Sequence, residues 1–194
     1  RTMLSMHAIH PTQTWPLWNT EASRQIERLA LHGLPDHTLM QRAGLAVARL
    51  ALAVAPHART IWVACGPGNN GGDGLDAALH LHQWGKTVWV TWLGDAQTAP
   101  ADTRAALARA QQAGVVLQAE PPGTLAATDL AIDALLGLGS TRAPAGQMAQ
   151  WIQRMNAGPA PVLAVDVPTG LHADTGALLA STPNTAVHAH HTLC

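Results

Sequence analysis

The sequence contains no phenylalanine and no tyrosine, so tryptophan is its only aromatic residue. Trp62, Trp89 and Trp92 fall in short apolar runs, and we expect them in the core. Cysteine is almost as scarce, because only Cys65, inside an apolar run, and the terminal Cys194 occur. Two such cysteines exclude a disulfide framework and a paired-cysteine metal site, and they favour a reducing compartment.

Lysine occurs once, at Lys86, beyond the helix expected after a glycine-rich segment. A phosphate-gripping lysine and a Walker loop are therefore disfavoured, and no nucleophile elbow is present. No apolar stretch approaches the roughly 20 residues that span a bilayer, and the first residues lack the basic and apolar regions of a secretory signal. We expect a cytoplasmic protein that does not bind a membrane.

Charge of either sign is also sparse, with eleven Lys and Arg residues against twelve Asp and Glu. Such a balance creates no global field that attracts nucleic acid, so a small-molecule partner is favoured. The 194 residues, 47% of them hydrophobic, are enough for one substantial core. The composition therefore predicts one compact domain.

Helical periodicity dominates the chain before residue 56. It predicts one helix that begins at Thr20, with Ile26, Leu29 and Ala30 on its apolar face, and ends near Gly33. A second helix is predicted over 36–54, where Pro56 ends it. Because both precede any strand, we expect them to pack on a sheet that forms later.

Short apolar runs then alternate with helical segments, which predicts an α/β fold with a doubly wound, mainly parallel sheet. The expected strands are Ile61–Cys65, Thr87–Leu93, Val115–Gln118, Leu130–Leu136 and Val162–Val167. The expected helices are Gly72–Trp84, Ala101–Ala113 and Gly146–Met155.

Three distinctive segments follow predicted strands: Gly66–Gly74, Asp133–Gly139 and Asp166–Gly170. In open α/β sheets, ligands bind outside the carboxyl ends of the strands. Because all three segments fall at that edge, we expect them to share one site.

The first segment reads Gly66-Pro67-Gly68-Asn69-Asn70-Gly71-Gly72-Asp73-Gly74. Its glycines allow a tight turn and expose amides at a helix start, which suits a pyrophosphate. Asn69, Asn70 and Asp73 say more, because a sugar, a nicotinamide amide or a cation needs amide and carboxylate groups and a plain phosphate does not. In the alternative interpretation, the asparagines supply turn conformations and Asp73 caps the helix.

The other two segments each contribute a carboxylate at a strand. Asp133 lies in an apolar strand, where a buried carboxylate needs a cation or several hydrogen-bond donors. The alternative is pairing with Arg142 or with loop amides. Asp166 precedes a rigid Pro168 turn and can exchange a proton at an open site, although it also suits a plain turn.

These residues resemble the YjeF N-terminal family, the NAD(P)H-hydrate epimerases. The resemblance covers nearly the whole chain and rests most specifically on the nine-residue glycine string. It extends to Leu39-Met40-Gln41-Arg42-Ala43-Gly44, to Asp133 with Gly137 and Gly139, and to Asp166-Val167-Pro168-Thr169-Gly170 with Thr175-Gly176. Among its departures, Thr169 stands where the family commonly has serine, Leu79 where arginine is common, and His172 where aspartate is common.

The resemblance implies a Rossmann-like three-layer sandwich with two N-terminal helices. Residues 18–194 would form the epimerase domain, ending early for the family, and residues 1–17 would be an N-terminal extension. Members interconvert the R and S forms of NADHX and NADPHX, in which water has added across the nicotinamide ring. A partner NAD(P)H-hydrate dehydratase, as a domain or a separate protein, then restores the cofactor, and a homodimer is left open.

The resemblance also implies roles for individual residues. From its position at a strand end beside the Pro168 turn, we expect Asp166 to be the catalytic acid and base, with Asp73 as its rival. The hydrated dinucleotide would contact Asn69, Asn70, Gly71, Gly72, Asp73, Gly137, Leu138, Gly139, Ser140, Thr141, Arg142, Ala143 and Asp166. A potassium ion would be bound by Asn70, Asp133 and Thr169, whose oxygen ligands suit a hard monovalent cation.

Two other functions compete with this interpretation. One is a non-catalytic, dimerising and RNA-associated scaffold on the same fold, which the neutral net charge disfavours. The other is an ordinary dehydrogenase, disfavoured because no acid ends the strand Thr87–Leu93 at the ribose position. His188, His190 and His191 suggest either a metal site or, in our preferred interpretation, a disordered or truncation-derived tail.

Overall fold

The computed structural model describes residues 12, 14, 18–181 and 184–194, so the expected extension over 1–17 lies outside the described residues except at 12 and 14. A six-stranded sheet with the order β3-β2-β1-β4-β5-β6 organises the fold. Its strands are β1 (Thr60–Cys65), β2 (Thr87–Trp92), β3 (Leu117–Gln118), β4 (Leu130–Ala134), β5 (Val162–Val165) and β6 (His191–Leu193). All neighbouring strands pair in parallel, which confirms the predicted sheet.

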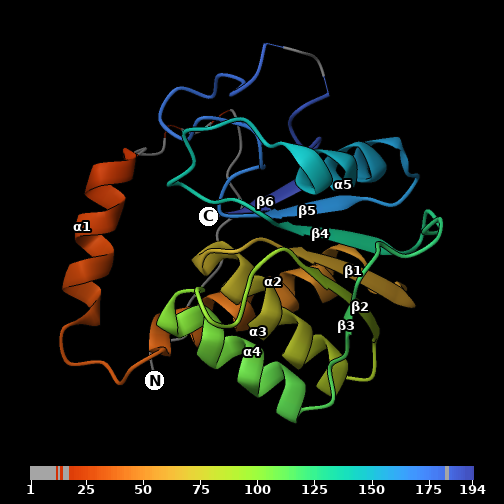
Figure 1. The fold of residues 1–194 in the computed structure, drawn as a ribbon, viewed down its shortest axis with the longest axis horizontal. Coiled ribbons are helices and arrows are strands. Elements are labelled where there is room, and N and C mark those ends of the chain that lie inside the picture. Colours follow the sequence, from red (N-terminus) through yellow and green to blue (C-terminus); the bar gives the residue numbers. More distant parts are fainter. Residues whose placement is uncertain (1–11, 13, 15–17, 182–183) are drawn as a thin grey trace.

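Helices cover both faces of this sheet. They are α1 (Thr20–Leu31), α2 (Thr38–Val54), α3 (Asn69–Gln83), α4 (Ala101–Gln112) and α5 (Gly146–Ala157). Figure 1 shows α2, α3 and α4 on one face and α5 on the other. Since side chains alternate along a strand, Val63 of β1 packs in the core on the α3 side, whereas Trp62 packs against Trp151 of α5. The predicted three-layer sandwich is confirmed.

The expectation that both N-terminal helices pack on the sheet is wrong for α1. None of its residues is buried, and the side chains expected on its apolar face, Ile26 and Leu29, are 49% and 63% exposed. Figure 1 shows α1 set apart from the other helices. By contrast, α2 buries Met40 and Val47 and lies mainly against α3.

The last of the C-terminal histidines belongs to the sheet, so the expected disordered tail is wrong. His191 begins β6, which pairs with β5, and the Nδ1 atom of His190 accepts a hydrogen bond from the Val162 amide at 3.0 Å. Among the described residues there is no cluster of His, Cys, Asp and Glu that could hold a metal ion. A membrane-spanning helix is likewise absent from the described part of the chain.

The sheet places the site through its topology. The strand order runs outward from β1 toward β3 on one side and from β4 toward β6 on the other, so the direction of winding reverses between β1 and β4. The loops that leave the carboxyl ends of such neighbouring strands diverge and leave a crevice between them. The glycine string follows β1 and Leu135–Gly139 follows β4, so both flank this crevice.

Candidate active site

A cleft of about 820 Å³ lies at the carboxyl edge of the sheet, and parts of all three distinctive segments line it. The predicted contact residues that line it are Asn69, Asn70, Asp73, Gly137, Leu138, Gly139, Ser140, Thr141, Arg142, Ala143 and Asp166. The structure therefore gathers residues from the ends of β1, β4 and β5 around one space, as the crevice rule requires.

Gly71 and Gly72, although predicted to contact ligand, do not line the cleft. They lie inside α3, where a Cβ on Gly71 would meet the Gly66 carbonyl oxygen at 2.0 Å and one on Gly72 would meet the Met40 side chain at 2.5 Å. Helix α3 begins at Asn69, three residues before the predicted start. These two glycines thus serve close packing of the first helical turn against the rest of the protein.

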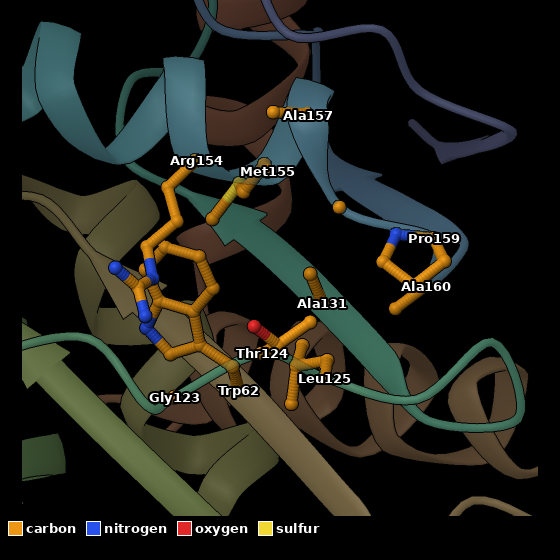
Figure 2. Close-up of a pocket in the computed structure, with 11 residues that line it drawn as sticks. Trp62, Gly123, Thr124, Leu125, Ala131, Arg154, Met155, Ala157, Pro159 and Ala160 are labelled. Atoms are coloured by element: carbon orange, nitrogen blue, oxygen red, sulfur yellow. The ribbon is translucent and has the colours of Figure 1, made fainter.

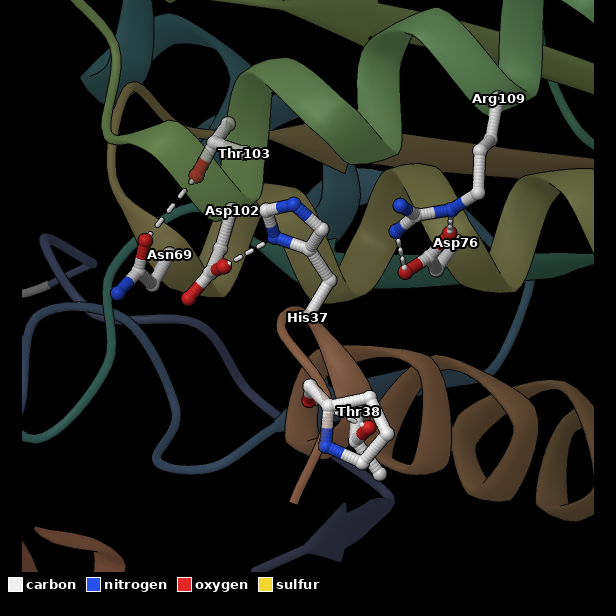
Figure 3. A network of polar contacts seen from close by, with 8 residues as sticks. His37, Thr38, Asn69, Asp76, Asp102, Thr103 and Arg109 are labelled. Carbon is white, nitrogen blue, oxygen red and sulfur yellow. Dashed lines mark hydrogen bonds and ion pairs between the residues drawn. The ribbon is translucent and has the colours of Figure 1, made fainter. Parts of the chain in front are cut away.

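Asn69 is held in place by the buried Thr103 of α4. The Thr103 hydroxyl lies 3.2 Å from the Asn69 Oδ1 atom and 3.2 Å from the Gly68 carbonyl oxygen, and it can donate to either (Figure 3). The amide oxygen of Asn69 is therefore engaged within the protein, which leaves its NH₂ group for the cleft. The turn interpretation of the asparagines is not supported, because both lie within the regular first turn of α3.

Asp73 does not cap the helix. The N-cap of α3 is Gly68, which makes no side-chain capping bond, and Asp73 lies one turn further on and faces the cleft. Burial, followed by the charges of Asp166 and other carboxylates, raises the pKa of Asp73 to about 8. A carboxyl group with this pKa is mostly protonated at neutral pH and can donate a hydrogen bond to a ligand.

Asp166 has a left-handed backbone, with φ of 69°, directly after β5. Its Oδ2 atom accepts a hydrogen bond from the Leu138 amide at 2.7 Å, which ties the end of β5 to the loop after β4. A Cβ on Gly137 would lie 2.5 Å from Oδ2, so only glycine permits this approach. Burial raises the pKa of Asp166, although the Leu138 amide opposes the shift.

Asp133 lies fully buried beneath the cleft, and protein donors satisfy much of its carboxylate. Oδ1 accepts bonds from the Thr169 hydroxyl at 2.7 Å and the Leu135 amide at 3.2 Å, and Oδ2 accepts one from the Thr169 amide at 2.8 Å. Burial raises the pKa of Asp133 to about 6, with these donors acting against the shift. Of the alternatives left open by the sequence, the structure contains the loop amides and not an ion pair with Arg142.

The residues expected to bind potassium all carry buried oxygen atoms. Asn70 has both amide atoms buried without a hydrogen-bond partner among the described residues, an arrangement that costs free energy unless something else binds there. The Asp133 carboxylate and the Thr169 hydroxyl supply further oxygen atoms. This donor set, a carboxylate with neutral oxygens, fits a hard monovalent cation.

A second cavity, of about 230 Å³, lies away from these residues. Figure 2 shows it between Trp62, Leu125 and Met155, with Arg154 at its side. It is bordered by the segments that lead into β4 and β5, at the opposite end of these strands from the cleft. The Arg154 guanidinium donates to the Pro122 carbonyl oxygen, so its charged group is already engaged. None of the described residues that line this cavity is a carboxylate, so the larger cleft is the candidate site.

Helix α1 also contributes to the cleft, which was not predicted, because Arg24 and Glu27 both line it. They lie three residues apart and therefore on the same face of the helix. A helix periodicity indicates which residues share a face, but it does not indicate what that face meets. Helix α1 is attached to the distant loop after β5 by hydrogen bonds from Thr20 to Asp174, and no local sequence pattern predicts this contact.

Comparison with known proteins agrees with this architecture. Residues 36–194 match the family described as "YjeF-related protein N-terminus". The crystal structure of the yeast protein YNL200c superimposes with a TM-score of 0.76 at 21% identity, covering 92% of this chain and 79% of that one. At this identity the likeness concerns the fold alone.

Sequence relatives are closer. An NAD(P)H-hydrate epimerase from Limosilactobacillus fermentum is 42% identical over 149 residues, covering 76% of this chain and 70% of that protein. One from Rhodopirellula baltica is 34% identical over 189 residues, covering 94% and 75%. The bifunctional NAD(P)H-hydrate repair enzyme Nnr of Escherichia coli is 39% identical over 181 residues, covering 91% of this chain and 34% of that protein.

Proposed function

The chain belongs to the family of YjeF-related N-terminal domains, and from this premise we propose that it is an isomerase, an NAD(P)H-hydrate epimerase that acts in the repair of nicotinamide cofactors. Relatives carrying that name are 34% and 42% identical over most of the chain. The observation that carries the proposal is the convergence of Asp73, Asp166 and the Gly137–Ala143 loop on one cleft. We assign this activity to a domain formed by residues 18–194.

The dinucleotide occupies the cleft. The cleft is formed where the sheet changes its direction of winding, and it opens beside the first turn of α3, whose free amides favour an anion. The NH₂ group of Asn69 and the protonated carboxyl of Asp73 add hydrogen-bond donors, which suit the ribose and carboxamide oxygens of such a ligand.

Asp166 acts as the acid and base of the reaction. Inversion at C6 of the hydrated ring requires either reversible ring opening or loss and return of the hydroxyl, and both routes move a proton at the C6 oxygen. The Leu138 amide fixes Oδ2, which leaves Oδ1 to face substrate. Burial raises the pKa of Asp166 above its usual value, which favours its action as an acid as well as a base.

Asn70, Asp133 and Thr169 would hold a potassium ion, which would supply a positive charge beside the buried Asp133 carboxylate. The orphaned amide of Asn70 supports this assignment, because an ion would satisfy its oxygen.

The ion has a test that is independent of catalysis. Thermal unfolding in potassium chloride should occur at a higher temperature than in tetramethylammonium chloride of equal ionic strength, since binding to the folded state alone stabilises it. Asn70→Ala should remove this difference in unfolding temperature. Asn156 lies in α5 and does not line the cleft, so the Asn156→Ala variant should retain the difference. Identical unfolding temperatures in both salts for the unmodified protein would exclude the site.

The activity itself is tested with the purified chain. Separated R and S hydrates of NADPH should each approach the equilibrium mixture, followed by chromatography, faster than in protein-free buffer. An unchanged spontaneous rate, together with intact folding by circular dichroism, would refute the proposal.

The S hydrate formed by the epimerase must be used by a second enzyme. An NAD(P)H-hydrate dehydratase, either a separate protein or a further domain as in the bifunctional relatives, would remove water from the S form. We propose the cytoplasm, a reducing compartment, as the location of this repair reaction, and the reaction itself requires neither a membrane nor nucleic acid. A homodimer is compatible with the exposed apolar side chains of α1.

A further inference from the structure

The cleft offers few positive side chains for a site that must admit an anion. Two arginines, Arg24 and Arg142, line it beside the carboxyl groups of Glu27, Asp73 and Asp166. Because the single lysine, Lys86, donates instead to the carbonyl oxygens of Pro56 and Ala58, it is engaged elsewhere. A doubly charged pyrophosphate therefore has two cationic side chains available among the described residues of the cleft.

Arg24 reaches the cleft from α1, opposite the loop that follows β4. A Cβ on Gly139 would lie 2.7 Å from its Nη2 atom, so the guanidinium rests directly on that loop. Among the described residues, Arg24 forms no ion pair and no hydrogen bond, although Glu27 lies three residues further along the helix. An unpaired guanidinium in a concave site has five donors free for a planar or tetrahedral anion.

The position of α1 is fixed by polar contacts at its beginning. The backbone amide and the hydroxyl of Thr20 both donate to Oδ1 of Asp174, at 2.6 and 2.8 Å, and the Asn19 side chain caps the helix through the Ala22 amide. Asp174 belongs to the loop that follows Asp166 and Thr169 in the chain. The same loop connection thus holds both the proposed acid and the helix that carries Arg24.

We propose that Arg24 binds the pyrophosphate of the dinucleotide, so that α1 forms one wall of the substrate site. This inference rests on the proposed function and extends it to a residue that lies before the family-matched segment. It also gives a function to a helix that buries none of its side chains. The helix serves the ligand, and its contribution to the core is negligible.

The test compares two arginines of the same helix. Arg28 lies in the last turn of α1, is exposed and does not line the cleft, so Arg28→Gln is the matched control for Arg24→Gln. Calorimetric titration with ADP-ribose should show affinity about tenfold weaker for Arg24→Gln, because a charge-assisted phosphate contact is lost. Arg28→Gln should bind as the unmodified protein does, and Glu27→Gln should bind more tightly because a like charge is removed.

A second ligand, ADP-ribose carrying a 2′-phosphate, distinguishes the phosphate groups. A contact to the pyrophosphate predicts the same loss for both ligands, and in the epimerase assay a raised KM with kcat nearly unchanged. A loss confined to the 2′-phosphate ligand would overturn the assignment to the pyrophosphate. Equal affinities of Arg24→Gln and Arg28→Gln would overturn the inference while leaving the epimerase proposal intact. Failure of the unmodified protein to bind either ligand would overturn both.

Discussion

Asp73, Asp133 and Asp166 lie close to one edge of the sheet, yet different hydrogen-bond donors surround them. Asp133 accepts three bonds from Thr169 and Leu135, and burial raises its pKa only to about 6. Asp73, where burial and neighbouring carboxylates act in the same direction, has a pKa of about 8. The number of donors therefore separates a carboxylate that holds loops together from one that keeps its proton at neutral pH.

The raised pKa of Asp73 predicts a pH-dependent difference in stability. Between its ordinary pKa of 3.8 and about 8, the folded protein holds a proton that the unfolded chain has lost, so stability falls as pH rises through this window. Asp73→Asn removes this loss, and its advantage in free energy of unfolding over the unmodified protein should grow by up to about 1.4 kcal/mol per pH unit. Urea titrations at several pH values measure the difference, and parallel pH profiles for the two proteins would contradict it.

The Thr169 hydroxyl should contribute substantially to the free energy of unfolding, because it is both a donor and an acceptor in buried hydrogen bonds. Thr169→Val keeps the shape but removes a donor to Asp133 and an acceptor for the Leu136 amide, which is bound at 3.0 Å. We expect a loss of about 2 to 3 kcal/mol in the free energy of unfolding. Thr169→Ser, which retains the hydroxyl, is the control. The comparison is made by urea unfolding without potassium, and a Val variant as stable as the Ser variant would show that the hydroxyl is not needed.

At the scale of the element, α4 braces the helix that carries the glycine string. Figure 3 shows three of its side chains reaching other elements: Asp102 to His37 at 2.5 Å, Thr103 to Asn69, and Arg109 to Asp76. The Arg109 guanidinium binds both carboxylate oxygens of Asp76, at 3.1 and 2.7 Å. Since Asp76 is only 2% exposed, α3 depends on this partner.

Loss of that partner should destabilise the fold. Arg109→Ala leaves the Asp76 carboxylate buried and unpaired, for which we expect a cost of about 3 kcal/mol. Arg49→Ala, which removes an exposed arginine of α2, should change stability by less than about 0.5 kcal/mol. Chemical denaturation followed by tryptophan fluorescence tests the pair, and equal midpoints would mean that Asp76 finds other partners.

Most elements could be predicted from the sequence to within a few residues, because buried parallel strands read as short apolar runs and the helices between them have clear periodicity. The start of α3 could not. Glycine disfavours helices, so the predicted helix began only at Gly72, whereas α3 begins at Asn69 and packs Gly71 closely against Gly66. The strand β6 was missed because His191–Leu193 lacks an apolar run and gains its order from pairing with β5.

Some residues of the candidate site could likewise be predicted from the sequence, and others could not. Asp133 and Asp166 could be predicted because a carboxylate at the end of an apolar strand is unusual and strand ends of a parallel sheet meet at one edge. Arg24 could not, because its contact with the Gly139 loop depends on how α1 is attached through Asp174. The contact between Thr20 and Asp174 joins residues 154 positions apart, so it produces no periodic pattern in the sequence.

At the scale of the whole molecule, two parts of the protein surround the cleft: the sheet with its packed core, and helix α1. The sheet supplies Asp166 and the loop after β4 from elements with extensive cores on both faces. Helix α1, which buries nothing, supplies Arg24 and Glu27. The family prediction made from the glycine string is confirmed by the match over residues 36–194, and the division explains how chemistry and ligand binding can be altered separately.

The most direct measurement is the rate of interconversion of R and S NADPH hydrate by the unmodified protein, Asp166→Asn and Arg28→Gln under identical conditions. A positioned acid and base contributes about 10² to 10⁴ in rate, so Asp166→Asn should lose activity by that factor while still binding ADP-ribose, and Arg28→Gln should remain fully active. Interconversion by Asp166→Asn at the rate of the unmodified protein would contradict the assignment of proton transfer to Asp166.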